Sequence, residues 1–245
     1  MNIAIISGAS SGIGLEIVKE LDKLCLDELW LVSSSKDKLL LASENLTTKA
    51  RILPLDLSNE QYISELSLLL KNENPSVKYL VCSAGVGFNG AFEELTNENI
   101  AKMIDINVRA LTSLTHTALP YVSTDGRIIE IASSAGFMPQ PYFSVYSATK
   151  SYVISFSRAL RAELKKKKIY VTAVCPGPVE TPFFTGLENV KEYKKKYAIS
   201  PQRVAKGALK ASKRKKSLYI PTFSMKMVRL ASKIIPTSLM LKFYK

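Results

Sequence analysis

Short apolar runs alternate with longer amphipathic stretches along most of the chain. Residues 2–6 form the first run, and its continuous apolar character is typical of a strand covered by helices on both faces. The stretch after it has Leu15, Val18 and Leu21 at helical spacing. Further strands are expected at 28–33, 51–55, 77–82, 127–131, 169–175 and 217–220, and helices at 36–45, 59–71, 97–122, 145–166 and 201–213. This order predicts βαβ units, and hence an α/β fold with a Rossmann-like, doubly wound parallel sheet in a single domain.

The end of the chain departs from this alternation. We expect residues 1–221 to form the main domain and residues 222–245 to form a C-terminal extension. In the extension, apolar residues recur at helical spacing from Met227 to Ile234, and basic residues lie on an adjoining face. Pro236 is expected to end this helix, and an apolar pattern resumes after it. The extension is therefore predicted to be basic and amphipathic.

The positive charge of the protein is concentrated near its end. The 245 residues have a formal net charge of +13, and residues 193–245 contain 15 Lys and Arg but no Asp or Glu. Such asymmetry indicates an anionic partner. A basic amphipathic helix with interfacial aromatic residues can lie on an anionic membrane surface. The alternative is that the extension packs on its own domain or on a second copy, with its lysines in solvent.

No sequence feature indicates export. The chain begins directly with an apolar run, without the basic start and cleavage site of a signal peptide, and no run of about 18 uncharged apolar residues predicts a spanning helix. The cysteines, Cys25, Cys82 and Cys175, have no metal-like spacing and are interpreted as reduced core thiols. We therefore expect a cytoplasmic protein, peripheral at the inner membrane face if the extension binds lipid, with no metal site and no nucleic-acid partner.

Tyr146 and Lys150 are the first candidates for chemistry. Residues four apart share one helix face, and a cationic amine beside a phenol is expected to lower the phenol pKa. Such a tyrosine can exchange a proton with a carbonyl or hydroxyl at neutral pH. Ser133 follows an expected buried strand, so its hydroxyl could hold the substrate oxygen over the tyrosine.

A glycine-rich turn joins the first strand to the first helix. Gly8, Gly12 and Gly14 permit a tight turn and close backbone approach, and the N-terminus of the helix would face an anion such as a pyrophosphate. The spacing is Gly-x-x-x-Gly-x-Gly, which differs from the common dinucleotide fingerprint. Its place after an N-terminal strand favours nucleotide binding over a simple turn.

Over residues 1 to about 220, these motifs and their order resemble the short-chain dehydrogenase/reductase family. The resemblance implies four catalytic residues: Asn107, which would hold a proton-relay water, Ser133, Tyr146 and Lys150. It also implies a cofactor-binding set consisting of Gly8, Ser10, Ser11, Gly12, Ile13, Gly14, Ser33, Ser34, Ser35, Lys36, Asp56, Leu57, Ser83, Ala84, Gly85, Asn107, Tyr146, Lys150, Pro176, Gly177, Val179 and Thr181. Ser83 departs from the family pattern, which usually has asparagine there. The resemblance further implies a homodimer or homotetramer.

The end of the second expected strand indicates which dinucleotide is preferred. An acidic residue there would accept the adenosine 2′-hydroxyl and repel a 2′-phosphate. This chain has three serines, residues 33–35, followed by Lys36, and no acid before Asp37. Hydroxyls and a lysine suit a phosphate, so NADP(H) is favoured over NAD(H), although the arginine usual in the family is missing. If the serines only cap the next helix, this preference disappears.

The predicted function is an NAD(P)-dependent oxidoreductase that interconverts a carbonyl and a secondary alcohol on a hydrophobic, lipid-like substrate. Apolar and aromatic residues are expected to line the substrate pocket, although some could belong to the core or a lid: Val86, Phe88, Phe137, Met138, Tyr142, Phe143, Phe183, Phe184 and Leu187, with Ser133. One alternative is a 3-oxoacyl-[acyl-carrier-protein] reductase, whose acidic carrier would also suit the basic end of the chain. A non-catalytic dinucleotide-sensing docking module is a second alternative, but it would not need all four catalytic residues.

Overall fold

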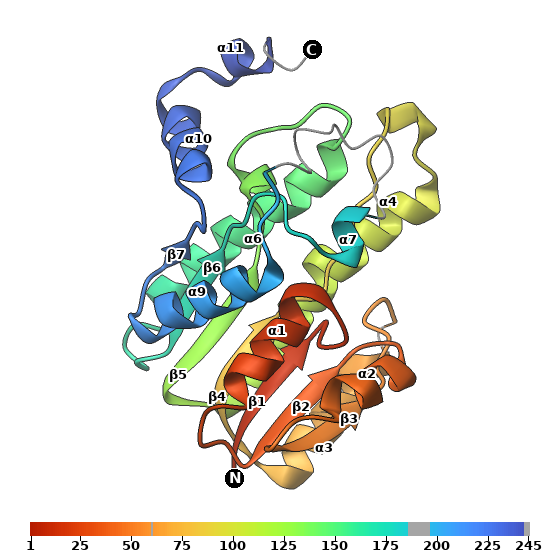
Figure 1. Ribbon diagram of the computed structural model, residues 1–245, viewed down its shortest axis with the longest axis vertical. Helices are drawn as coiled ribbons and strands as arrows, with labels where there is room; N and C mark the ends of the chain where they lie inside the picture. Colours follow the sequence, from red (N-terminus) through yellow and green to blue (C-terminus); the bar gives the residue numbers. More distant parts are fainter. Residues whose placement is uncertain (60, 186–196, 243–245) are drawn as a thin grey trace.

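A seven-stranded sheet forms the centre of the molecule (Figure 1). The computed structural model describes residues 1–59, 61–185 and 197–242. The strands are β1 (Asn2–Ser7), β2 (Glu28–Val32), β3 (Lys49–Leu53), β4 (Ser76–Cys82), β5 (Val122–Ile131), β6 (Tyr170–Val174) and β7 (Leu218–Tyr219). They lie in the order β3-β2-β1-β4-β5-β6-β7, and every neighbouring pair is parallel. The predicted Rossmann-like, doubly wound α/β fold is confirmed.

Helices cover both faces of the sheet, as the continuous apolar strands predict. One face is covered by α3 (Gln61–Glu73), α5 (Leu111–Ala118) and α6 (Ser144–Glu163), and the other by α1 (Gly12–Leu21), α2 (Lys36–Ser43) and α9 (Pro201–Lys213). Successive side chains of β1 alternate between the two cores: Ile3 and Ile5 pack in the first, and Ala4 and Ile6 in the second. Because both faces are buried, the polar groups of the sheet meet solvent only at its two ends and its edges.

The stretch expected to be helical over 97–122 is divided into several elements. It consists of α4 (Asn97–Ile104), the π-helical segment η2 (Asp105–Ala110), α5 and the 3₁₀ turn η3 (Leu119–Tyr121). The expectation for Val122 is wrong, because this residue starts β5 and pairs with Val77. The register then shifts, and Asp125 has a positive φ of 66°, so β5 bends before its regular part begins at Arg127.

The C-terminal residues form two further helices. They are α10 (Phe223–Ile234) and α11 (Thr237–Leu241), and Pro236 lies between them as expected. Both stand at the end of the molecule opposite the N-terminus (Figure 1). The remaining short elements are η1 (Phe92–Glu94), η4 (Ser134–Phe137) and α7 (Pro182–Thr185). None of the helices within the described ranges is long and apolar enough to cross a membrane.

Candidate active site

The candidate site lies where the order of the strands reverses. From β1 the chain builds the sheet outward through β2 and β3, and then returns to place β4 on the other side of β1. In open parallel sheets, ligands bind outside the carboxyl ends of the strands at such a point. The loops after β1 and β4 meet here, because the Ser7 hydroxyl accepts the backbone N–H groups of Ser83 and Ala84 at 3.1 and 3.3 Å.

The loop after β1 needs its glycines. Gly8 and Gly12 have φ values of +66° and +55°, a region that disfavours side chains. A Cβ on Gly8 would lie 2.8 Å from the Ala84 nitrogen, and one on Gly14 would lie 2.1 Å from the Gly8 oxygen. Ser11 precedes α1, and its side chain makes no capping hydrogen bond within the described chain. Backbone N–H groups at the start of α1 therefore face this close turn, and the loop fits an anionic group such as a dinucleotide pyrophosphate.

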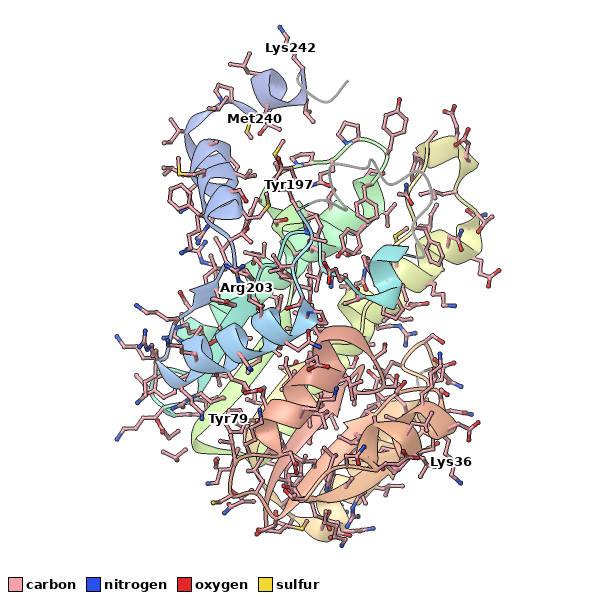
Figure 2. The ribbon with its side chains drawn as sticks, in the orientation of Figure 1. Lys36, Tyr79, Tyr197, Arg203, Met240 and Lys242 are labelled. Carbon is pink, nitrogen blue, oxygen red and sulfur yellow. The ribbon has the colours of Figure 1, made fainter. Side chains whose placement is uncertain are left out.

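The end of β2 lies beside the glycine loop. The Ser10 and Ser33 hydroxyls are 2.8 Å apart and hydrogen-bonded. The Ser35 hydroxyl accepts the Lys38 N–H at 3.4 Å, so this serine caps α2. Ser34 and Lys36 are exposed next to it, and Figure 2 shows Lys36 at the surface. The three serines thus have different environments.

The next strand end contributes Asp56 and Leu57. One carboxylate oxygen of Asp56 accepts both the N–H and the hydroxyl of Ser58, at 2.9 and 2.8 Å, and these bonds lower the Asp56 pKa. The carboxylate is therefore ionised and held in place at neutral pH. Leu57 is buried in the core, so only its backbone could meet a ligand.

The loop after β6 closes the other side of the site. The Pro176 carbonyl accepts the Ser134 N–H at 2.8 Å, which ties this loop to the residue after Ser133. A Cβ on Gly12 would lie 3.1 Å from the Thr181 side chain, so the β6 loop reaches the glycine turn. The structure thus brings the expected cofactor residues together at the carboxyl ends of the parallel strands. Ile13 and Val179 also lie there, but their side chains contribute mainly to the core.

The Tyr146 side chain is buried and close to the other candidate catalytic residues. The Ser133 side chain lies near the Tyr146 hydroxyl and acts to lower the phenol pKa. The Lys150 amine donates to the Ile131 carbonyl at 2.9 Å and lies 5.7 Å from the centre of the Tyr146 ring. Gly85 has no side chain, and a Cβ there would be 3.3 Å from the Lys150 Nζ and 3.2 Å from the Asn107 Oδ1. Both polar atoms therefore border the space beside Gly85.

The expected lowering of the Tyr146 pKa is wrong for this structure. Burial raises the pKa of the phenol to about 12, and the nearby Ser133 side chain offsets only part of this. Burial also lowers the pKa of the Lys150 amine to about 8. The prediction failed because the amine is held by a backbone carbonyl and lies over the ring, and because sequence spacing does not reveal how far the pair is buried.

Asn107 is fixed by three hydrogen bonds inside the π-helical segment η2. Its Oδ1 accepts the Val86 N–H at 2.9 Å, and its Nδ2 donates to the Val86 carbonyl at 2.8 Å and to the Thr149 hydroxyl at 3.1 Å. That hydroxyl in turn donates to the Tyr146 carbonyl at 2.7 Å. π-Helical segments are frequent at functional sites. Thr149, which the sequence analysis missed, therefore links Asn107 to the helix turn that carries Tyr146.

Four of the expected substrate residues surround Tyr146. Val86, Phe88, Phe143 and Phe183 pack against the cluster formed by Met103, Ala135 and Tyr146. The Phe143 ring is stacked on Tyr146 at 4.2 Å between centroids, and the Phe183 ring lies at 5.5 Å. Gly87, also missed, is required here, because a Cβ on it would lie 2.6 Å from Phe183 and 3.1 Å from Tyr146.

Other expected substrate residues lie elsewhere or are not described. Tyr142 is 69% exposed and Phe137 packs on the core next to α10, so neither belongs to the cluster around Tyr146. Met138 is buried outside that cluster. Leu187 and the side chain of Phe184 lie outside the described residues.

A buried carboxyl lies beneath the site. Glu130, on β5, is fully buried, and its Oε1 accepts the Thr115 hydroxyl at 3.0 Å. Its Oε2 has no hydrogen-bond partner among the described residues. Burial raises the Glu130 pKa to about 7. The Lys150 cation and the Glu130 carboxylate stabilise each other's charged form. Glu130 therefore favours the protonated amine of Lys150.

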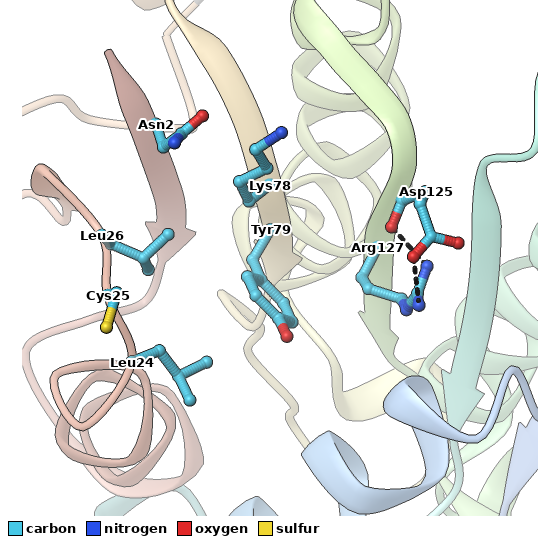
Figure 3. A pocket seen from close by; sticks show the side chains of 8 residues that line it. All are labelled: Asn2, Leu24, Cys25, Leu26, Lys78, Tyr79, Asp125 and Arg127. Atoms are coloured by element: carbon cyan, nitrogen blue, oxygen red, sulfur yellow. Dashed lines mark hydrogen bonds and ion pairs between the residues drawn. The ribbon is translucent and has the colours of Figure 1, made fainter.

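A hollow of about 320 Å³ lies at the opposite end of the sheet (Figure 3). It is lined by Asn2, Leu24, Cys25, Leu26, Lys78, Tyr79, Asp125 and Arg127, none of which belongs to the candidate site. Arg127 is held there by Asp125 at 3.2 Å. Cys25 is exposed, which corrects the expectation that it is a core thiol, whereas the other two cysteines are buried.

Comparison with known proteins identifies the family. The family model described as short chain dehydrogenase matches residues 2–192. The chain belongs to the short chain dehydrogenase family. An uncharacterized oxidoreductase of Staphylococcus aureus is 28% identical over 229 residues, which cover 92% of this chain and 97% of that protein. The family and its solved members support an oxidoreductase with a nicotinamide dinucleotide cofactor.

Two solved members of the short chain dehydrogenase family align with nearly the whole chain. A short-chain dehydrogenase from Sphingobium yanoikuyae in complex with NADPH is 26% identical, with a TM-score of 0.83, and the alignment covers 98% of this chain and 95% of that one. The bulky-bulky ketone specific alcohol dehydrogenase from Comamonas testosteroni is 25% identical, with a TM-score of 0.79 and coverages of 98% and 94%.

Proposed function

We propose that this chain is an NADP(H)-preferring oxidoreductase that interconverts a carbonyl and a secondary alcohol on a hydrophobic substrate. The observation that carries the proposal is the Tyr146 phenol, which is buried in an aromatic cluster near Ser133, at the carboxyl end of the parallel strands. The phenol is protonated at neutral pH, so Tyr146 holds a proton that carbonyl reduction can consume. The raised pKa makes it a weaker acid, but the alkoxide formed by hydride transfer is a stronger base than a phenolate and can take the proton.

Each candidate catalytic residue then has a separate task. When bound, the reduced nicotinamide supplies a hydride to the carbonyl carbon. Ser133 and Tyr146 donate hydrogen bonds to the carbonyl oxygen, which stabilises the negative charge developing there, and Tyr146 transfers its proton to that oxygen. Lys150 would hold the nicotinamide ribose when the cofactor is bound, and its amine would keep positive charge near the phenolate that remains. Asn107 fixes the helix turn under Tyr146 and borders, with Lys150, the space through which a proton is returned.

The preference for NADP(H) is supported by the end of β2. Ser34 and Lys36 are exposed beside the glycine loop, and residues 33–36, at the end of β2, include no acidic side chain that would repel a 2′-phosphate. The solved relative from Sphingobium yanoikuyae contains NADPH. Ser35 caps α2 and Ser33 is bonded to Ser10, so Ser34 and Lys36 are the residues proposed to contact the phosphate.

A hydrophobic substrate is supported by the side chains around Tyr146. Three phenylalanines and Val86 pack there, and an apolar wall of this kind favours a bulky hydrophobic carbonyl over a sugar. The relative from Comamonas testosteroni is specific for bulky ketones.

We place the activity in the cytoplasm, at the inner face of a membrane, because the excess positive charge of residues 193–245 favours an anionic surface. The family resemblance further favours a homodimer or homotetramer.

The proposal is tested by measuring NADPH oxidation against a panel of carbonyl compounds. Bulky apolar ketones should be reduced at a higher kcat/KM than sugars, and NADPH should be used better than NADH. Carrier-bound, CoA-bound and free 3-oxoacyl compounds belong in the same panel. A strong preference for the carrier-bound compound would establish the 3-oxoacyl-[acyl-carrier-protein] reductase instead. Cofactor binding without turnover of any compound would support the dinucleotide-sensing module.

A further inference from the structure

Helix α10 has a stripe of large apolar side chains that face solvent. Phe223, Met227, Leu230 and Ile234 follow one another at intervals of four, three and four residues, so they share one helix face. Their exposed fractions run from 48% to 76%. We call these four residues the outer stripe. Contiguous exposed apolar surface of this kind marks an interaction site in soluble proteins.

The opposite side of α10 rests on the candidate active site. A Cβ on Gly177, in the loop after β6, would lie 3.1 Å from the Met225 side chain. The Arg229 guanidinium lies 6.0 Å from the centre of the Phe137 ring, at the end of the turn η4 that follows Ser133. One helix thus separates the outer stripe from the loops of the site, and the diameter of a helix with its side chains is about 10–12 Å.

The positive charge around α10 indicates what kind of partner the outer stripe binds. Lys226, Arg229 and Lys233 lie on α10, and no acidic residue occurs between 193 and 245. Two copies joined through their outer stripes would bring like charges together, which disfavours a second copy as the occupant. An anionic lipid surface satisfies both the apolar stripe and the basic side chains. Figure 2 shows Met240 and Lys242 beyond α10, so the basic, apolar surface continues to the end of the described chain.

We propose that the outer stripe docks the protein on an anionic lipid bilayer, and that the substrate is a carbonyl or alcohol dissolved in that bilayer. Docking through α10 places the loops after β6 and Ser133 about one helix diameter from the lipid. A membrane-dissolved substrate can then enter without crossing bulk water. The docking part rests on α10 alone, whereas the substrate part rests on the proposed oxidoreductase function.

The test is co-sedimentation of the full chain with vesicles of phosphatidylglycerol or of phosphatidylcholine. Binding should occur with the anionic vesicles, weaken as salt rises, and be absent with the neutral ones. The variant Phe223→Gln/Ile234→Gln should bind about tenfold more weakly or worse, because it removes the two most exposed side chains of the stripe. The control Leu41→Gln/Leu68→Gln changes two leucines on α2 and α3 that are 63% and 61% exposed, and it should bind like the wild type.

The charge arm uses Lys226→Gln/Lys233→Gln, with Lys166→Gln/Lys167→Gln as its control on the exposed turn after α6. Only the α10 pair should lose affinity for the anionic vesicles and show a weaker salt dependence. Absence of vesicle binding at low salt, or equal binding by the stripe variant, overturns the proposal. A concentration-dependent dimer that the stripe variant abolishes would assign the stripe to a second copy, and binding of an acidic protein without vesicle binding would assign it to a protein partner.

NADPH-dependent reduction of a water-soluble ketone and of a vesicle-dissolved ketone is measured in parallel. The stripe variant should keep its rate on the soluble ketone and lose about tenfold on the dissolved one. Equal loss on both would overturn the substrate part of the proposal. If the wild type binds vesicles but reduces neither ketone, the proposed oxidoreductase function fails while docking stands.

Discussion

Glu130 gives the stability of this protein a predictable pH dependence. The carboxyl has a pKa of about 7 in the folded chain, against an ordinary value of 4.5. Below about pH 4.5 it is neutral in both states and costs nothing. As pH rises toward 7, the unfolded chain releases the proton more readily, so stability is lost over this window. Two titratable side chains, Cys82 and Lys150, lie next to Glu130. Burial raises the Cys82 pKa, so the thiol stays neutral. The Glu130 pKa of about 7 already includes the attraction of the Lys150 cation.

The size of the effect follows from the two pKa values. A difference of about 2.5 pKa units corresponds to about 3 kcal/mol of unfolding free energy above pH 7. Glu130→Gln keeps the side-chain volume and an acceptor for the Thr115 hydroxyl, but it cannot ionise. We therefore expect the variant to gain about 3 kcal/mol relative to the wild type between about pH 4.5 and about pH 8.5. Any pH-independent effect of the glutamine amide on the unfolding free energy cancels, because the difference between variant and wild type is compared at two pH values.

Urea unfolding followed by tryptophan fluorescence measures this difference. The chain has one tryptophan, Trp30, which is fully buried in β2 and reports on the core. The control Glu65→Gln changes an exposed carboxylate on α3 and should shift stability by less than about 0.5 kcal/mol at either pH. If the difference between Glu130→Gln and wild type is the same at both pH values, Glu130 does not have a raised pKa and the reasoning is refuted.

Three further predictions concern the site. Lys150→Ala should lower both turnover and cofactor affinity, as measured by steady-state kinetics and fluorescence titration, and loss of only one would remove one of its two tasks. Gly87→Ala should lower kcat about tenfold or more, because the new methyl group must displace Phe183 and crowd Tyr146; unchanged kcat would show that the ring positions are not critical. NADPH should bind more tightly than NADH in the same titration, and Ser34→Asp should reverse this order, whereas equal affinities would mean that the serines only cap α2.

The fold could be predicted because its signals are local. Continuous apolar strands, helical spacing and glycines in the β1–α1 turn all depend on neighbouring residues. Val122 was assigned wrongly because its pairing with Val77 is a contact across the sheet. The order of the motifs identified the family. Their meeting at the carboxyl ends of the strands follows from the parallel topology of the sheet.

The details of the site depend on contacts that sequence spacing does not contain. The raised pKa of Tyr146 comes from its burial, and one of the rings packed on it, Phe183, lies on α7, far from Tyr146 in the sequence. The Thr149 bond to Asn107 joins α6 to η2. The amphipathic character of α10 was visible in the sequence, but its contact with Gly177 was not. Tertiary neighbours decided each of these features.

The most direct test of the central proposal is the rate of NADPH-dependent ketone reduction by Tyr146→Phe. The ring and its stacking on Phe143 are kept and only the proton donor is lost, so turnover should fall about 10²-fold or more while NADPH affinity stays nearly unchanged. The control Tyr152→Phe removes a hydroxyl from the same helix, one that bonds Thr112 outside the site, and should keep the wild-type rate. Wild-type turnover by Tyr146→Phe would contradict the assignment of Tyr146 as the proton donor.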